Sequence, residues 1–158
     1  MVRFAINGLG RIGRAVTRAY FEGDYPKIEL VAFNGPAMAS DHAHLLQYDS
    51  VHGKFSATVD YSDKSMIING KDIPLSRERD ITQIKWPALD VVLECSGKFN
   101  KRALASAHLN QGASKVLVSA PCEQADATIV YGVNHQQLSI NHKVISIGSC
   151  TTNCLAPV

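Results

Sequence analysis

The stretch Phe4-Ala5-Ile6-Asn7-Gly8-Leu9-Gly10-Arg11-Ile12-Gly13 decides the fold of this chain. It places the glycine pattern GxGxxG directly after an apolar run, residues 2–6, that is typical of a strand. Apolar residues at helical spacing follow over residues 11–22. A strand, a glycine turn and a helix in this order form the context in which the pattern predicts a dinucleotide-binding βαβ unit.

Each glycine of the turn has its own expected role. Gly8 permits the tight turn, Gly10 lets a pyrophosphate approach the backbone, and Gly13 lets the helix and strand pack closely. The helix N-terminus offers free N–H groups and a favourable dipole to the anion, and Arg11 is placed to contact phosphate. The alternative is a purely structural strand-to-helix turn, which this context disfavours.

Apolar runs and helical periodicity continue to alternate along the rest of the chain. They predict strands over residues 28–33, 91–95, 116–118, 127–131 and 143–147, and helices over 41–47 and 101–110. Residues 55–75 alternate polar and apolar around Asn69-Gly70, which predicts a small antiparallel hairpin. The whole pattern indicates an α/β fold, a Rossmann-type doubly wound parallel sheet with that hairpin inserted.

Four short polar segments follow the predicted strands, at residues 7–13, 34–36, 96–99 and 119–121. The carboxyl ends of parallel strands meet at one edge of a sheet, and ligands bind beyond that edge. We therefore expect the four segments to converge on a single long ligand.

The second predicted strand ends in Asn34-Gly35, where dinucleotide-binding domains usually carry an acidic residue about 20 positions after the turn. Asn34 can hydrogen-bond a ribose hydroxyl, although without charge assistance. The missing carboxylate also removes the repulsion that would exclude a 2′-phosphate, so both NAD and NADP stay open. Glu29 lies inside the strand and is badly placed to substitute.

Composition excludes several other functions. The 158 residues suffice for one ordinary domain, and 46% hydrophobic with 19% charged residues is typical of a globular protein. The net charge of +2 comes from scattered basic residues, which argues against nucleic-acid binding. No apolar run is long enough for a membrane span and no signal peptide pattern begins the chain, so a cytoplasmic location is expected.

Cysteines and histidines show no metal-binding pattern. The four cysteines, at positions 95, 122, 150 and 154, form no CxxC pair and are expected to be free thiols. The six histidines are all expected to be surface or turn residues. No metal site is predicted.

The segment Ser146-Ile147-Gly148-Ser149-Cys150-Thr151-Thr152-Asn153-Cys154 places a cysteine among small hydroxyl residues just after a predicted strand. This pattern predicts a cysteine at a helix N-terminus, where the dipole and free N–H groups favour the thiolate. Ser149, Thr151 and Thr152 supply donors suited to a phosphate or an oxyanion. From composition alone, a buried structural cysteine is the alternative. Cys154 shares the helix face of Cys150 and is expected to pack.

Four motifs together resemble those of the phosphorylating glyceraldehyde-3-phosphate dehydrogenases, and the resemblance spans the whole chain. They are AINGLGRIGR at residues 5–14, YDSVHG at 48–53, ERD at 78–80 and SCTTNC at 149–154. SCTTNC is highly specific to this family, which also contains erythrose-4-phosphate dehydrogenase.

The resemblance implies roles for individual residues. Cys150 would be the nucleophile, with Ser149, Thr151 and Thr152 contacting substrate or inorganic phosphate. Arg11 and Ile12 would meet the pyrophosphate, Asn34 the adenosine ribose, Arg79 the adenine region, and Ser119 the nicotinamide side. The full expected cofactor set is Asn7, Gly8, Gly10, Arg11, Ile12, Gly13, Asn34, Gly35, Arg79, Ser96, Gly97, Phe99 and Ser119.

The resemblance also implies an activity and an organisation. An aldose phosphate would be oxidised through a cysteine thioester to an acyl phosphate in glycolysis or gluconeogenesis, with NAD as cofactor. Residues 1–149 would form the dinucleotide-binding domain, and 150–158 would open a catalytic domain whose histidine activates the thiol and whose arginines hold the substrate phosphate. We therefore expect the chain alone to be inactive and the full-length enzyme to be a homotetramer.

Two departures from the family pattern leave alternatives open. Gly35 stands where NAD-using members usually carry Asp, and Ile147-Gly148 replaces the common Asn-Ala before the cysteine segment. Erythrose-4-phosphate dehydrogenase is one alternative, although Glu at position 35 would have favoured it more. A non-catalytic dinucleotide-binding module is the other.

Overall fold

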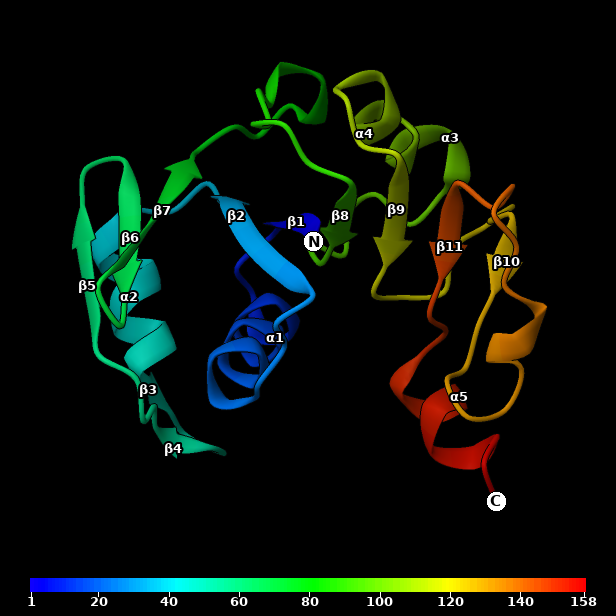
Figure 1. Ribbon diagram of the computed structural model, residues 1–158, viewed down its shortest axis with the longest axis horizontal. Coiled ribbons are helices and arrows are strands. Elements are labelled where there is room, and N and C mark those ends of the chain that lie inside the picture. Colours follow the sequence, from blue (N-terminus) through cyan, green and yellow to red (C-terminus); the bar gives the residue numbers. More distant parts are fainter.

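The structure is a computed structural model that describes all 158 residues. Its main sheet has nine strands in the order β10-β11-β9-β8-β1-β2-β7-β6-β5 (Figure 1). The strands are β1 (Val2–Asn7), β2 (Ile28–Asn34), β5 (Val59–Ser62), β6 (Ser65–Ile68), β7 (Lys71–Ser76), β8 (Val91–Glu94), β9 (Lys115–Val118), β10 (Ala127–Thr128) and β11 (Val144–Ser146). A separate ribbon pairs β3 (Tyr48–Asp49) with β4 (Gly53–Lys54).

Five α-helices and two 3₁₀ turns accompany the strands. The helices are α1 (Arg11–Glu22), α2 (Ala39–Gln47), α3 (Arg102–Ala105), α4 (Ala107–Asn110) and α5 (Cys150–Leu155), and the 3₁₀ turns are η1 (Ile81–Gln83) and η2 (His135–Gln137). None of these helices combines the length and apolar character that crossing a bilayer requires.

Both faces of the sheet contribute core residues, as is typical of a doubly wound fold. β1 pairs in parallel with β2 on one side and β8 on the other. Phe4 and Ile6 of β1 pack in the large core cluster that includes residues of α1 and α2. Ala5, between them, belongs to a second cluster on the opposite face. Alternate residues of one strand thus serve two cores, and the predicted Rossmann-type α/β fold is confirmed.

The predicted hairpin is present and carries the turn that its sequence favours. Asn69 and Gly70 both have positive φ, 49° and 77°, as a two-residue type I′ turn between β6 and β7 requires. The structure adds a third antiparallel strand, β5, and pairs β7 in parallel with β2. The hairpin therefore extends the main sheet and brings the segment after β7 next to the end of β2.

Other elements differ from prediction at their ends. The helix expected over 101–110 is divided at Ser106, whose hydroxyl donates to the Arg102 carbonyl at 2.7 Å. The strand expected over 127–131 is limited to Ala127–Thr128, and beyond it the Val130 N–H donates to Asn134 Oδ1 at 2.7 Å. The short helix expected at residue 41 begins at Ala39.

Candidate dinucleotide-binding site

The glycine turn between β1 and α1 depends on close backbone approaches. Gly8 has φ +97°, and a Cβ there would lie 2.5 Å from the Cα of Ser96, in the loop after β8. A Cβ at Gly13 would lie 2.0 Å from the carbonyl oxygen of Gly8. No larger residue fits either position, so these two glycines let the turn, the helix and the neighbouring loop pack together.

The N-terminus of α1 is left open. Gly10 is its N-cap, no side chain caps the helix, and a Cβ built on Gly10 would meet nothing within 4 Å. Arg11 and Ile12 are exposed in the first turn. The first N–H groups of a twelve-residue helix therefore face open space, which is the arrangement that binds anions.

A cavity of about 280 Å³ lies beside this helix N-terminus at the carboxyl edge of the sheet. Three of the four polar segments predicted to converge contribute to it. Of the predicted cofactor residues, those that line it are Asn7, Gly8, Gly10, Asn34, Arg79, Ser96 and Phe99.

The remaining predicted residues adjoin this cavity or lie elsewhere. The first turn of α1 follows directly after Gly10, which lines the cavity, and contains Arg11, Ile12 and Gly13. Gly35 and Gly97 are next in the chain to residues that line it. Ser119, from the fourth polar segment, is not among the lining residues, and its N–H donates to the Glu94 carbonyl at 3.0 Å.

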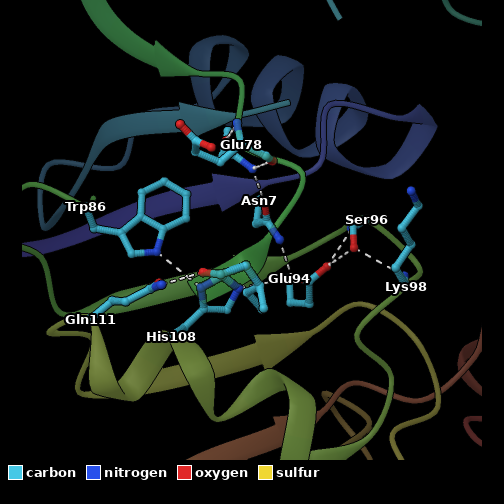
Figure 2. A network of polar contacts seen from close by, with 10 residues as sticks. Asn7, Glu78, Trp86, Glu94, Ser96, Lys98, His108 and Gln111 are labelled. Atoms are coloured by element: carbon cyan, nitrogen blue, oxygen red, sulfur yellow. Dashed lines mark hydrogen bonds and ion pairs between the residues drawn. The ribbon is translucent and has the colours of Figure 1, made fainter. Parts of the chain in front are cut away.

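A buried carboxylate, Glu94 at the end of β8, organises the floor of the site (Figure 2). One oxygen accepts from Asn7 Nδ2 at 2.5 Å and from His108 Nε2 at 3.1 Å. The other accepts from the N–H and hydroxyl of Ser96 at 2.7 and 2.5 Å. Four donors match the four acceptor positions of an ionised carboxylate, so Glu94 ties the ends of β1 and β8 to the loop at Ser96.

His108 contacts this carboxylate as a neutral ring. The indole Nε1 of Trp86 lies 3.2 Å from His108 Nδ1, and an indole can only donate (Figure 2). Nδ1 must therefore accept, and the ring proton sits on Nε2, directed at Glu94. His108 is fully buried, so it positions Glu94 and is not available as a catalytic base.

The Asn34 amide has protein partners for every hydrogen-bonding position. Its oxygen accepts from the Ser76 hydroxyl at 2.8 Å and the Glu78 N–H at 2.9 Å. Its nitrogen donates to Asn7 Oδ1 at 2.8 Å and to the Glu78 carbonyl at 3.0 Å. No capacity is left for the ribose hydroxyl that we expected Asn34 to bind. Its side chain instead holds the segment at Ser76–Glu78 against the end of β2.

The cysteine segment forms a helix start as predicted. Cys150 is the first residue of α5, and the N-cap Ser149 accepts the Thr152 N–H at 2.9 Å. Cys150 is exposed, which argues against the structural alternative for this residue. In Figure 1 α5 follows β11 at the edge to which the arrowheads of β8, β9 and β11 point.

The other thiols behave differently. All four cysteines are free. Burial raises the pKa of the Cys95 thiol to about 11, while Cys154 is exposed and does not pack as we expected. Cys154 lies one turn from Cys150 in α5, which buries none of its residues.

Two site residues escaped prediction from sequence. Glu94 carried a signal, because an acidic residue inside the apolar run of a parallel strand is unusual. His42 lines the cavity from α2 and carried none. The expectation that all six histidines lie at the surface or in turns is wrong for His42 and His108, whose exposed fractions are 6% and 0%.

Comparisons with known proteins agree with this geometry. Residues 2–102 match the family model described as glyceraldehyde 3-phosphate dehydrogenase, NAD binding domain. Glyceraldehyde-3-phosphate dehydrogenase of Pseudomonas aeruginosa is 49% identical over 160 aligned residues, covering 99% of this chain and 48% of that protein. Glyceraldehyde-3-phosphate dehydrogenase 1 of Bacillus subtilis is 50% identical, covering 99% of the chain and 47% of that protein.

A relative from Thermotoga maritima, with the same name, is 46% identical over the whole chain. The chain spans about half the length of the curated relatives it matches. The family model covers most of the structure described above, including the glycine turn, the Asn34-Gly35 strand end and Glu94. The chain therefore belongs to the family of glyceraldehyde 3-phosphate dehydrogenase NAD-binding domains.

Proposed function

We propose that this chain binds NAD or NADP at the carboxyl edge of its sheet and supplies the nucleophile of a phosphorylating glyceraldehyde-3-phosphate dehydrogenase. The observation that carries the proposal is the uncapped N-terminus of α1, which opens beside a cavity lined by seven of the predicted cofactor residues. The open space above Gly10 fits a pyrophosphate, because a side chain there would occupy the place of the anion.

The cofactor would lie along the cavity from α2 towards the thiol. The N–H groups of Arg11 and Ile12 would hold the pyrophosphate, and Arg79 would lie beside the adenine. Ser96, Gly97 and Phe99 would line the middle of the cofactor, with Ser119 on the nicotinamide side. Asn7, Asn34 and Glu94 would act indirectly, by fixing the loops that make these contacts.

Cys150 would begin the chemistry from the exposed start of α5. Its thiolate adds to the aldehyde carbon, forming a C–S bond and an alkoxide. A nicotinamide held at this site would supply the acceptor for the hydride that leaves this carbon. The resulting thioester is cleaved when an oxygen of inorganic phosphate attacks its carbonyl, which releases an acyl phosphate and restores the thiolate.

The substrate side of the reaction needs groups beyond these 158 residues. Ser149, Thr151 and Thr152 would contact the aldose phosphate or the inorganic phosphate. As the family resemblance implies, the base that takes the thiol proton and the arginines for the substrate phosphate would come from further residues of the enzyme. The chain alone would then be inactive, and the full-length enzyme would act in the cytoplasm as a homotetramer, with no nucleic-acid or membrane partner.

Calorimetric titration of the 158-residue chain with NAD and with NADP tests the central proposal. We expect saturable binding of at least one cofactor. A Gly10→Asp variant should retain its fold, because Asp is a favourable N-cap residue and nothing obstructs it. Its carboxylate would compete with the pyrophosphate, and both affinities should fall by about tenfold or more.

The matched control introduces the same charge at the opposite edge of the sheet. Ser114 is exposed just before β9, and Ser114→Asp should leave cofactor affinity unchanged. Absence of binding in the unmodified chain, or equal binding in the Gly10→Asp variant, would contradict the proposal.

A further inference from the structure

The imidazole of His42 occupies the space that a side chain at position 35 would need. His42 belongs to α2, is 6% exposed and lines the cavity. A Cβ built on Gly35 would lie 2.6 Å from His42 Nε2 and 3.0 Å from its Cε1. Gly35 and His42 therefore form one unit at the end of β2, in which the ring replaces the missing side chain.

Neither ring nitrogen of His42 makes a well-formed hydrogen bond within the protein, although the Gly35 backbone lies close enough to act on one of them. Buried polar atoms almost always have a partner, so a ring nitrogen without one beside a cavity is a candidate to bind a ligand there. Asn34, next to Gly35, cannot serve that ligand because its amide is fully engaged. His42 is thus the group at this strand end with hydrogen-bonding capacity to spare.

The charges around His42 favour a strongly anionic ligand. Burial is the largest effect that lowers the pKa of His42, and the guanidinium groups of Arg14 and Arg77 lower it further. The Gly35 backbone and Asp41 act in the opposite direction. Arg79 and Glu78 line the same cavity, and neither Arg77 nor Arg79 forms an ion pair with an acidic side chain.

We propose that His42 binds the 2′-phosphate of NADP and, with Gly35, gives this chain a preference for NADP over NAD. The inference rests on the proposed cofactor site and adds its specificity. A 2′-hydroxyl could form a hydrogen bond with one ring nitrogen, but it would not neutralise the positive charges of Arg77 and Arg79. A phosphate dianion matches both the imidazole and the guanidinium groups, and no carboxylate at position 35 repels it.

The first test compares the affinities of NADP and NAD for the 158-residue chain by calorimetry. We expect NADP to bind about tenfold more tightly, as an added charge-assisted hydrogen bond allows. In His42→Leu, which keeps the bulk of the ring, NADP affinity should fall by about tenfold and NAD affinity should change less than about twofold.

The control is His44→Leu, which removes an exposed imidazole two residues along the same helix. Both affinities should stay as in the unmodified chain. Tighter binding of NAD than of NADP, or an unchanged NADP affinity in His42→Leu, would overturn the inference while leaving the cofactor site intact. Failure of both cofactors to bind would instead contradict the proposed function itself.

A second measurement uses only the unmodified chain and so does not depend on whether a variant folds. Competition of 2′,5′-ADP and of 5′-AMP against bound cofactor compares the same nucleotide with and without the 2′-phosphate. We expect 2′,5′-ADP to compete about tenfold more strongly than 5′-AMP, because it alone carries the 2′-phosphate that His42 and Arg79 would bind. Equal competition by the two nucleotides would overturn the inference.

Discussion

At the scale of single residues, Glu94 shows how a buried charge can be held without a cationic partner. It is 1% exposed and accepts four hydrogen bonds, one of them from a neutral histidine. Such a carboxylate is stable only while its donors remain, since an unsatisfied buried charge is costly. The same contacts hold the loop at Ser96 over Gly8, so stability and cofactor binding depend on one side chain.

Glu94→Gln should lower the free energy of unfolding by roughly 2 to 3 kcal/mol, because an amide has one acceptor oxygen for four donors. Urea denaturation followed by circular dichroism measures the change. The control Glu123→Gln alters a carboxylate that is 61% exposed, and should cost less than about 0.5 kcal/mol. Equal losses in both variants would show that the Glu94 network contributes no specific stability.

The cysteines should differ sharply in reactivity. At pH 8 the thiolate fraction of Cys95, with its pKa of about 11, is on the order of one in a thousand. Brief iodoacetamide treatment of the native chain should modify exposed Cys150 and leave buried Cys95 intact, as peptide mass spectrometry would show. In denaturant all four should react. Modification of Cys95 at the rate of Cys150 in the native chain would contradict the burial described here.

At the scale of secondary-structure elements, Asp126 joins α3 to β11. Its carboxylate accepts from Arg102 Nε at 2.7 Å and from the N–H groups of Lys143 and Val144 at 2.7 and 2.9 Å. Burial acts to raise the pKa of Asp126, but these hydrogen bonds outweigh it and lower the pKa to about 2. β11 leads into α5, so this side chain helps to place the cysteine helix.

Asp126→Asn should destabilise the chain by about 1 to 2 kcal/mol at pH 7. A pKa below the ordinary 3.8 means that the carboxylate stabilises the fold fully above pH 3.8 and loses this contribution as the pH falls towards 2. The difference between Asp126→Asn and the unmodified chain in urea denaturation should therefore shrink over that range. The control Asp63→Asn, at an exposed turn, should show no such dependence on pH. If the loss of stability in Asp126→Asn did not change with pH, the lowered pKa of Asp126 would be contradicted.

At the scale of the whole molecule, the face of the sheet beside α1 is incompletely covered. A cavity of about 320 Å³ there is lined by ten hydrophobic residues, among them Tyr20 of α1, Val91 and Leu93 of β8, and Leu117 of β9. Apolar surface of this kind binds hydrophobic probes. It lies apart from the cofactor cavity, with which it shares no lining residue.

The dye ANS should accordingly fluoresce on mixing with the folded chain. Leu117→Lys, which places a charge in the cavity, should reduce that signal severalfold without changing NADP affinity. Ser114→Asp, on the same loop-and-strand segment but outside the cavity, should leave the signal unchanged. An undiminished signal in Leu117→Lys would place the dye elsewhere.

Local patterns in the sequence determined the glycine turn, the order of strands and helices, and the hairpin at Asn69-Gly70. These features depend on neighbours in the chain, since φ preferences, helical spacing and strand alternation act over a few residues. The start of α5 at Cys150 was predictable for the same reason. The sequence alone also determined the family, through motifs that are each contiguous.

Only the tertiary structure decided which polar residues are buried and what they bind. Asn7 meets Glu94 across 87 positions, Asn34 meets Glu78 across 44, and β7 joins β2 to bring that second pair together. His42 is assigned a role only because folding sets its ring against Gly35, seven residues away in sequence but on a different element. Burial and hydrogen-bond satisfaction are sums over all neighbours in space, and no local pattern of residues encodes them.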